Sequence, residues 1–303
     1  MSTEKYAIAI RSYDRSESIK THTYKSLAEQ DGIDLSELLY IFVANEEEAE
    51  KYKESLRGLP YREIVIGKYG VGGSNAMRSI SEYLPKNLWV LFLDDDLGAF
   101  GEYTSAPETY EAAKKYKIEP APNLAIYIED AIDTMRKFNL FACDFGRGLN
   151  YFYLPGHCWK EIRPDFLVGG CSLMRNIPKI VKTKYAHDDD AERTANVLEE
   201  CGAILRYNWA GFSLGSWGST PGGMQSSGDR GNESERSRYT RRICYEMRET
   251  IPHFKKYFSS IIYSKDAELW AAKMKTFPQL QKISPTHIAF PKYFSKQYID
   301  LSL

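Results

Sequence analysis

The segment Leu88-Trp89-Val90-Leu91-Phe92-Leu93-Asp94-Asp95-Asp96 decides the fold. Its six apolar residues predict a strand buried in a sheet, and this strand runs directly into three carboxylates. Because burying three like charges is very costly, this end of the strand must be exposed or paired with cations. Alternation along a strand puts Asp94 and Asp96 on one side and Asp95 on the other. Two carboxylates so placed can hold a divalent cation against a phosphate, and the alternative is an acidic turn after a core strand.

Short apolar segments alternate with helical patterns around this segment. Strands are predicted at 6–10, 38–44 and 63–66, and helices at 16–30, 46–56 and 76–83. This alternation predicts a parallel sheet with helices on both faces, and ligands of such sheets bind outside the carboxyl ends of the strands. Arg11, Arg15, a glycine-rich segment at 67–75 and the three aspartates all follow predicted strands. We therefore expect one site at this edge.

The second half of the chain continues with mixed patterns. Residues 101–122 have an irregular pattern with a short helix, and the segment at 213–232 reads as a glycine-rich loop. Helices are predicted at 123–138, 191–201 and 233–250, and strands at 140–145, 150–154, 166–174 and 203–207. The remainder reads as mixed helix and irregular chain. We expect a core domain over 1–212 and a flexible loop with a basic extension over 213–303, packing on the core.

The distribution of charge is more informative than its sum. The 303 residues have a formal net charge of −1. From residue 203 onward there are 15 Lys and Arg against 8 Asp and Glu, a net of +7, whereas the preceding part has a net of −8. A basic C-terminal third indicates a docking face for an anionic partner, and the alternative is a solvated helix surface.

The cysteines and the N-terminus indicate a soluble protein. Five cysteines without CxxC spacing are typical of reduced core thiols rather than of a metal site or a disulfide framework. Neither a signal peptide nor an apolar run near 18 residues is evident. We therefore expect a cytoplasmic protein without membrane contact, whose oligomeric state the sequence leaves open.

Gly70-Val71-Gly72-Gly73-Ser74-Asn75 opens a predicted helix. It is neither a Walker loop nor a GxGxxG motif. Its backbone N–H groups can nevertheless face an anion, and a tight turn is the alternative.

A second acidic cluster, Asp188-Asp189-Asp190, precedes a predicted helix. Helix capping needs one aspartate, and the other carboxylates can supply a general base. Ahead of it, the strand at 166–174 contains a Gly169–Gly170 pair, which often marks the close approach of a ligand. The cluster has two interpretations, a helix cap or a catalytic base.

Aromatic and basic residues surround the glycine-rich loop. Trp209 and Trp217 can form a lid or an acceptor platform, or they can be core residues. The arginines that follow suit a phosphate backbone, although glutamates lie between several of them. The candidates for acceptor or DNA binding are Trp209, Trp217, Arg230, Arg238, Arg241 and Arg242.

The order of these motifs resembles the GT-A class of nucleotide-sugar glycosyltransferases over roughly residues 6–212. More narrowly, the segments at 8–15, 40–43 and 93–97 are similar to the TET-associated glycosyltransferases, phage-type enzymes thought to glycosylate hydroxymethylated pyrimidines in DNA. The resemblance implies a Rossmann-type mixed sheet flanked by helices, with a helical or irregular C-terminal extension. It also implies a hexosyl- or pentosyltransferase in the cytoplasm, or in the host cytoplasm for a phage protein.

The resemblance further implies roles for individual residues. Asp94 and Asp96 would bind a divalent cation, Mn²⁺ or Mg²⁺, and the donor diphosphate. One of Asp188, Asp189 and Asp190 would be the base, and Asp189 is our choice. The donor, a nucleoside-diphosphate sugar, would contact Arg11, Tyr13, Arg15, Gly72, Gly73, Asn75, Arg78, Asp95 and Gly170. The acceptor would be 5-hydroxymethylcytosine or another hydroxymethylated pyrimidine in DNA.

Other functions stay open at this point. Many enzymes of the class supply a late histidine as a third metal ligand, and no histidine occurs between Gly202 and His253 here. The acceptor could instead be a glycan, a lipid-linked molecule or a protein. Paired acids after a strand also occur in nucleotidyltransferases. A catalytically silent nucleic-acid-binding module is a further alternative.

Overall fold

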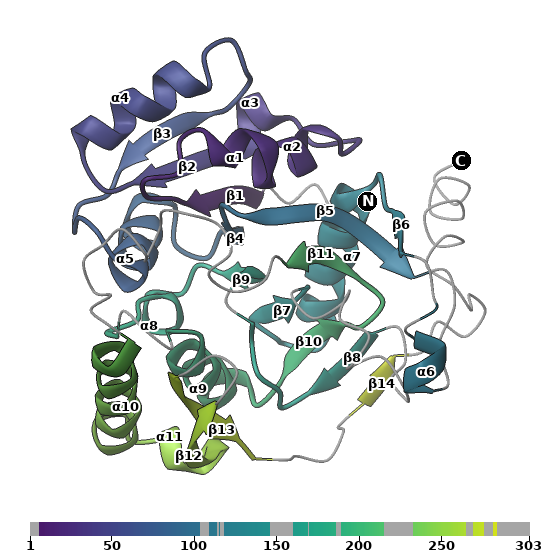
Figure 1. Ribbon diagram of the computed structural model, residues 1–303. Coiled ribbons are helices and arrows are strands. Elements are labelled where there is room, and N and C mark those ends of the chain that lie inside the picture. Colours follow the sequence, from purple (N-terminus) through teal and green to yellow (C-terminus); the bar gives the residue numbers. More distant parts are fainter. Residues whose placement is uncertain are drawn as a thin grey trace.

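A large mixed sheet runs through the molecule and contains nine strands among the residues that the structure describes (Figure 1). The computed structural model describes residues 6–103, 109–113, 115, 118–145, 160–168, 170–185, 189–214, 233–264, 269–275 and 281–283. The strand order is β14-β8-β10-β7-β9-β4-β1-β2-β3. These strands are β1 (Tyr6–Arg11), β2 (Leu39–Val43), β3 (Glu63–Ile66), β4 (Trp89–Asp94), β7 (Ala142–Asp144), β8 (Lys160–Arg163), β9 (Cys171–Arg175), β10 (Ile204–Tyr207) and β14 (Gln281–Ile283).

The apolar segment that ends in three aspartates forms β4, near the middle of this sheet. β4, β1, β2 and β3 are parallel to one another, with β1 between β4 and β2. β9 runs antiparallel to β4, and β7 runs antiparallel to β9. The α/β class with a mixed sheet is therefore confirmed, and the parallel arrangement expected from strand–helix alternation is present in β1 to β4.

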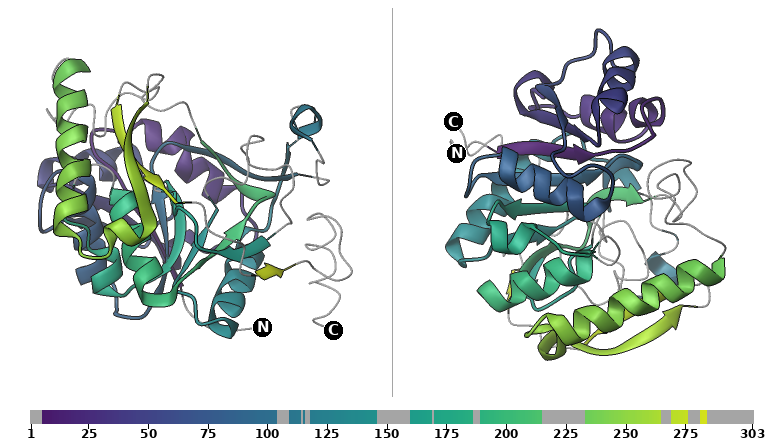
Figure 2. Two further views of the ribbon diagram at one scale, coloured as in Figure 1. Left: turned by 90° about the horizontal axis from the view of Figure 1, so that it is seen from below. Right: turned by 90° about the vertical axis from the view of Figure 1, so that its left-hand side faces the viewer.

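Helices cover both faces of the sheet (Figure 2). Their apolar sides enter two buried clusters: α1 to α4 and α7 contribute to the first, and α5 and α8 to α11 to the second. The helices are α1 (Ser18–Thr21), α2 (Thr23–Ala28), α3 (Leu35–Leu38), α4 (Glu46–Ser55), α5 (Gly73–Tyr83), α6 (Tyr110–Ala113), α7 (Leu124–Lys137), α8 (Pro178–Val181), α9 (Asp189–Cys201), α10 (Glu233–Thr250) and α11 (Phe254–Tyr257).

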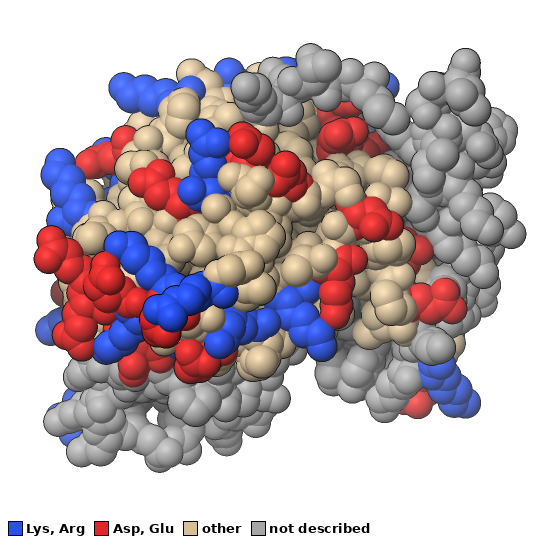
Figure 3. Space-filling view, turned by 90° about the horizontal axis from the view of Figure 1, so that it is seen from above, with Lys and Arg blue, Asp and Glu red and all other residues tan. Residues whose placement is uncertain are grey.

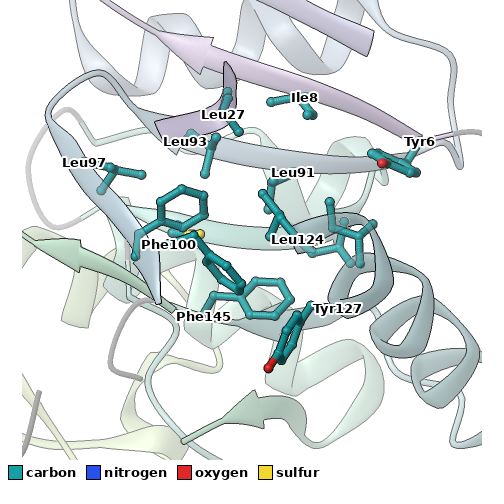
Figure 4. Packing of buried hydrophobic residues seen from close by; sticks show 14 of the residues in the cluster. Tyr6, Ile8, Leu27, Leu91, Leu93, Leu97, Phe100, Leu124, Tyr127 and Phe145 are labelled. Carbon is teal, nitrogen blue, oxygen red and sulfur yellow. The ribbon is translucent and has the colours of Figure 1, made fainter. Parts of the chain in front are cut away.

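Alternation along β4 sends its side chains into both clusters. Leu91 and Leu93 enter the first cluster, where Figure 4 shows them above the rings of Phe100, Tyr127 and Phe145. Phe100 meets Tyr127 edge to face, with 5.2 Å between the ring centroids. Val90 and Phe92 of the same strand enter the second cluster. Burial on both faces fixes the register of β4 and thus the position of its acidic end.

Two smaller sheets complete the fold. One has the order β11-β5-β6, formed by β5 (Leu97–Tyr103), β6 (Ile118–Pro120) and β11 (Ala210–Leu214). The other is a hairpin of β12 (Phe258–Ser264) and β13 (Leu269–Met274), which lies along α10 (Figures 1 and 2). The chain after residue 213 contacts the rest of the protein, since β14 pairs with β8 and Met247 of α10 is buried in the second cluster.

Several elements differ from those predicted. The helix predicted at 16–30 breaks at His22 into α1 and α2, because His22 has non-helical backbone angles and the next residue binds the end of β4. β5, β8, β11 and the β12–β13 hairpin were not predicted as strands. Apart from β12, these are short or include small residues, and they are fixed by tertiary pairing. The strand predicted at 150–154 lies outside the described residues.

The surface charges are mixed where α4 is exposed. Along α4, Lys51 pairs with Glu47 and Lys53 pairs with Glu50. The face seen in Figure 3 carries acidic and basic side chains interspersed. Within the described part of the chain, no helix has both the length and the apolar content needed to cross a membrane.

Candidate functional site

Arg11 and Asp94 lie side by side at the carboxyl ends of β1 and β4. The parallel register pairs these two residues directly. Two and four residues earlier, Ala9 and Ala7 of β1 enter the second cluster, so alternation puts Arg11 on the same face of the sheet. α9 covers this face, and its first residue is Asp189. The fold therefore brings the two acidic clusters of the sequence to one edge.

Arg11 connects these two clusters. Its Nε donates to Asp94 Oδ1 at 2.6 Å, and its NH1 donates to Asp189 Oδ2 at 3.0 Å. Burial acts to lower the pKa of Arg11, but the charges of Asp94 and Asp189 outweigh it and raise the pKa above its ordinary value. One guanidinium thus compensates two carboxylates that are 95 positions apart in the sequence.

Asp95 follows the last residue of β4 and is bonded on the side of the first cluster, to which Tyr52 belongs. It is 3% exposed and accepts a hydrogen bond from the Ser12 hydroxyl, which in turn bonds the Tyr52 hydroxyl of α4. Burial raises the pKa of Asp95 to about 6, although Arg15 and Ser12 act against this rise. This buried network anchors the acidic turn to α4.

Arg15 joins Asp95 to Asp96. Its NH1 lies 2.5 Å from Asp95 Oδ1 and 2.9 Å from Asp96 Oδ2. The alternation argument does not extend to Asp96, because β4 ends at Asp94 and residues 95–96 form a turn into β5. Asp94 and Asp96 are therefore each paired with a different arginine instead of forming an isolated carboxylate pair.

The two proposed metal ligands still suit a hard cation. The side chain of Asp94 is 32% exposed and that of Asp96 is 33% exposed. Asp94 Oδ2 and Asp96 Oδ1 have no bonding partner among the described residues. The described residues contain no group of three His, Cys, Asp or Glu side chains placed to share a metal ion. Mg²⁺ commonly takes only one or two carboxylates and completes its shell with water and substrate phosphates, so two aspartates fit such an ion.

The second acidic cluster divides into different roles. Asp189 is mostly buried, with 14% of its side chain exposed, and Arg193 NH2 lies 3.2 Å from its Oδ2. Asp190 Oδ1 accepts from the N–H of Ala191, and the Asp190 carbonyl accepts from the Thr194 hydroxyl. Asp190 thus serves the first turn of α9, and Asp188 lies outside the described residues. Asp189 is the described carboxylate of this cluster that reaches the site.

The glycine-rich segment forms the start of α5, after β3. Gly72 has a φ of +123°, a conformation that favours glycine, and Gly73 is the first residue of the helix. Asn75 donates from its side chain to the Val71 carbonyl at 2.8 Å. The Arg78 guanidinium lies 4.2 Å from the Tyr69 ring centroid. This loop is two strands away from β1 in the sheet order.

The remaining predicted site residues are spread more widely. The Gly170 carbonyl accepts from the N–H of Asp94 at 2.9 Å, and Tyr13 is half-buried in the loop after β1. Trp209 is 6% exposed in the first cluster, so its predicted role as an acceptor platform is not supported by its position. Arg238, Arg241 and Arg242 are exposed on α10. Trp217 and Arg230 lie outside the described residues.

Four residues of the site were not predicted. Ser12 and Tyr52 carry no sequence signal, because their contact depends on how α4 packs. The Thr23 hydroxyl donates to the Asp94 carbonyl at 2.7 Å and accepts from the N–H of Leu97 at 2.9 Å, which fixes the turn. Arg193 alone had a signal, since it follows Asp189 by four residues at the start of a helix.

Comparisons with known proteins give distant structural likenesses. No family model and no curated protein sequence matches the chain. S. aureus TarS 1–349 in complex with UDP-GlcNAc is 15% identical, with a TM-score of 0.43, over 80% of this chain and 66% of that one. The mannosyltransferase PcManGT from Pyrobaculum calidifontis, in complex with GDP-Man and Mn²⁺, is 11% identical, with a TM-score of 0.43, over 81% and 64%. A mycobacterial protein is 8% identical, with a TM-score of 0.44, over 90% and 84%.

This chain therefore matches just under two thirds of the length of TarS 1–349 and of PcManGT. These likenesses are distant, at 15% identity or less and TM-scores below 0.5.

Replacing Tyr52 by Phe tests the network that anchors the acidic turn. We expect the free energy of unfolding to fall by about 1–3 kcal/mol, because buried polar groups of Ser12 and Arg15 lose a partner. Tyr83→Phe is the matched control, since that hydroxyl bonds Glu63 at the surface and its loss should change the free energy by less than about 0.5 kcal/mol. Urea unfolding measures both variants, and equal losses would contradict the anchoring role.

Proposed function

We propose that this protein is a glycosyltransferase of the GT-A type. It moves a sugar from a nucleoside-diphosphate sugar to a hydroxyl acceptor, and we propose a hydroxymethylated pyrimidine in DNA as that acceptor. The observation that carries the proposal is the contact of Arg11 with both Asp94 and Asp189. It puts a carboxylate suited to the donor and a carboxylate suited to the acceptor within reach of one guanidinium.

On the donor side, Asp94 and Asp96 would hold a divalent cation. Such an ion neutralises charge on a leaving diphosphate. The arginines beside the two aspartates add donors for phosphate oxygens, since a guanidinium binds phosphate in a bidentate manner. Arg11 and Arg15 are already at this edge and are both partly exposed, at 17% and 11% of their side chains. Positive charge from the cation and from the two arginines would stabilise the departing nucleoside diphosphate.

The loop residues would bind other parts of the donor. Gly72 and Gly73 allow the backbone to approach a ligand closely, and α5 is long enough to offer N–H groups at its start. Asn75 and Arg78 would line this part of the donor site. Gly170 would lie near the sugar, because its carbonyl is bonded to the backbone of Asp94.

On the acceptor side, Asp189 would take the proton from the attacking hydroxyl. An alcohol is a poor nucleophile, and a positioned base contributes roughly 10²–10⁴-fold to such a step. Asp189 is held in a fixed place by its contacts with Arg11 and Arg193. Asp188 and Asp190 are the neighbouring alternatives, and Asp190 is already engaged in the first turn of α9.

Two aspartate variants separate the donor role from the acceptor role. We expect Asp94→Asn to weaken binding of a nucleoside diphosphate with Mn²⁺ by about 10- to 100-fold, because a charged contact is lost. Asp189→Asn should leave this affinity within about 2-fold and lower turnover by roughly 10²–10⁴-fold. Calorimetric titration with a panel of nucleoside diphosphates gives the first quantity, and transfer assays on hydroxymethylated DNA give the second.

Asp133→Asn, an exposed aspartate on α7, is the matched control and should change neither quantity. Absence of binding by every nucleoside diphosphate with Mn²⁺ or Mg²⁺ would contradict the donor proposal. Full turnover by Asp189→Asn would place the base elsewhere. Transfer to a glycan or a protein but not to DNA would leave the enzyme class standing and overturn the acceptor.

The exposed side of α10 supports a nucleic-acid acceptor. The guanidinium of Arg241 lies 5.8 Å from the ring centroid of Tyr245, which is 45% exposed. Arg242 lies 5.3 Å from the ring centroid of Tyr239 and 3.6 Å from Glu246. Arginines beside aromatic rings suit a phosphate backbone with accessible bases, and a target base in a duplex must leave the stack to react.

A triple variant, Arg238→Ala with Arg241→Ala and Arg242→Ala, tests this surface. We expect weaker binding to a duplex containing 5-hydroxymethylcytosine. The slope of the logarithm of the binding constant against the logarithm of the salt concentration should become shallower by about 2–3, because up to three phosphate contacts are lost. The matched control replaces three exposed cations by Ala, namely Lys51 and Lys53 of α4 and Arg57 of the turn after it. Fluorescence anisotropy at several salt concentrations measures both proteins. Unchanged binding by the α10 variant would contradict the proposed DNA surface.

A further inference from the structure

Arg193 is a fully buried arginine on α9. Its relative exposure is 0%, and it lies in a stretch of α9, residues 191–195, in which every residue is buried. Removing a guanidinium from water is costly, and partners usually compensate for this cost. The partners of Arg193 therefore indicate why the charge is there.

Asp189 supplies these partners. Arg193 follows it by one helical turn, and its side chain runs back toward the start of α9. Nε lies 3.4 Å from the Asp189 carbonyl oxygen, and NH2 lies 3.2 Å from Asp189 Oδ2. The contact of NH2 with Oδ2 is an ion pair, and neither NH1 nor NH2 has a hydrogen-bond partner among the described residues. The compensation of this buried charge is thus concentrated on one residue.

Two guanidiniums share the same oxygen of Asp189. Arg11 reaches Oδ2 from β1, and Arg193 reaches it from within α9. The two arginines differ in their other contacts, because Arg11 also binds Asp94 at 2.6 Å, whereas no other carboxylate pairs with Arg193 in the described part of the chain. A ligand that draws Arg11 away from Asp189 would leave Arg193 in place.

We infer that Arg193 is the positioning residue for Asp189, holding its carboxylate toward the acceptor hydroxyl while Arg11 turns to the donor diphosphate. This inference rests on the proposed function. Arg193 acts through Asp189 and does not touch either substrate. Positioning Asp189 requires a cation buried at this point of α9. This requirement explains why the site has an arginine, although an apolar side chain could be buried there at a lower cost in free energy.

Arg193→Met keeps the length of the side chain and removes the charge. We expect kcat to fall by about 10²-fold, because a displaced base loses its alignment, while both KM values stay within about 2-fold. Arg193→Lys should recover part of kcat, since it retains a charge but not the planar fork. Combining Arg193→Met with Asp189→Asn should cost no more than Asp189→Asn alone, because both changes remove one function.

Arg175→Met is the matched control. Arg175 pairs in register with Trp89 at the opposite end of β4 and should keep full turnover. A crystal structure of Arg193→Met gives a readout independent of turnover, and we expect the Asp189 carboxylate to leave its position 3.0 Å from Arg11. If this variant does not fold, Arg193→Lys is used for the same structure.

Three results would each overturn the positioning role. The Asp189 carboxylate could stay in place in the Arg193→Met structure, or Arg193→Met could leave kcat unchanged. The double variant could also lose kcat by the product of the two single-variant losses. Failure of the proposed function is recognised differently, because the unmodified protein would then bind no nucleoside diphosphate with Mn²⁺ or Mg²⁺ and transfer no sugar.

Discussion

The ion pairs of Arg11 are the interaction on which the site depends. Arg11 ends β1, and it lies in register with Asp94 on β4 and under the start of α9. Without this guanidinium, Asp94 and Asp189 would face one another across a partly buried edge, where like charges repel strongly. The arginine permits the fold to bring both acidic clusters together, and Asp94 keeps one oxygen without a partner among the described residues.

The balance of charge around this edge favours binding of a cation. In the described part of the site, three arginines face four aspartates. The arginines are Arg11, Arg15 and Arg193, and the aspartates are Asp94, Asp95, Asp96 and Asp189. One carboxylate is therefore in excess, and the most exposed members are Asp94 and Asp96. A bound divalent cation would change the local net charge from negative to positive, and the same edge would then attract a diphosphate.

The sequence predicted the parts of this site better than their connections. β4 and its acidic end were predictable, because an apolar run followed by charges is typical of a buried strand with an exposed end. α10 was predicted with its observed bounds. The contact of Arg11 with Asp189 was not predictable, since it depends on α9 lying across the sheet. Likewise, the antiparallel strands β7 and β9 and the position of Trp209 in the core follow from tertiary packing rather than from local patterns.

A crystal structure with Mn²⁺ and the nucleoside diphosphate that binds most tightly would test the central claim most directly. The account predicts the ion at Asp94 and Asp96, with phosphate oxygens within hydrogen-bond distance of Arg11. A nucleotide bound elsewhere, with Arg11 still joining Asp94 to Asp189, would contradict it.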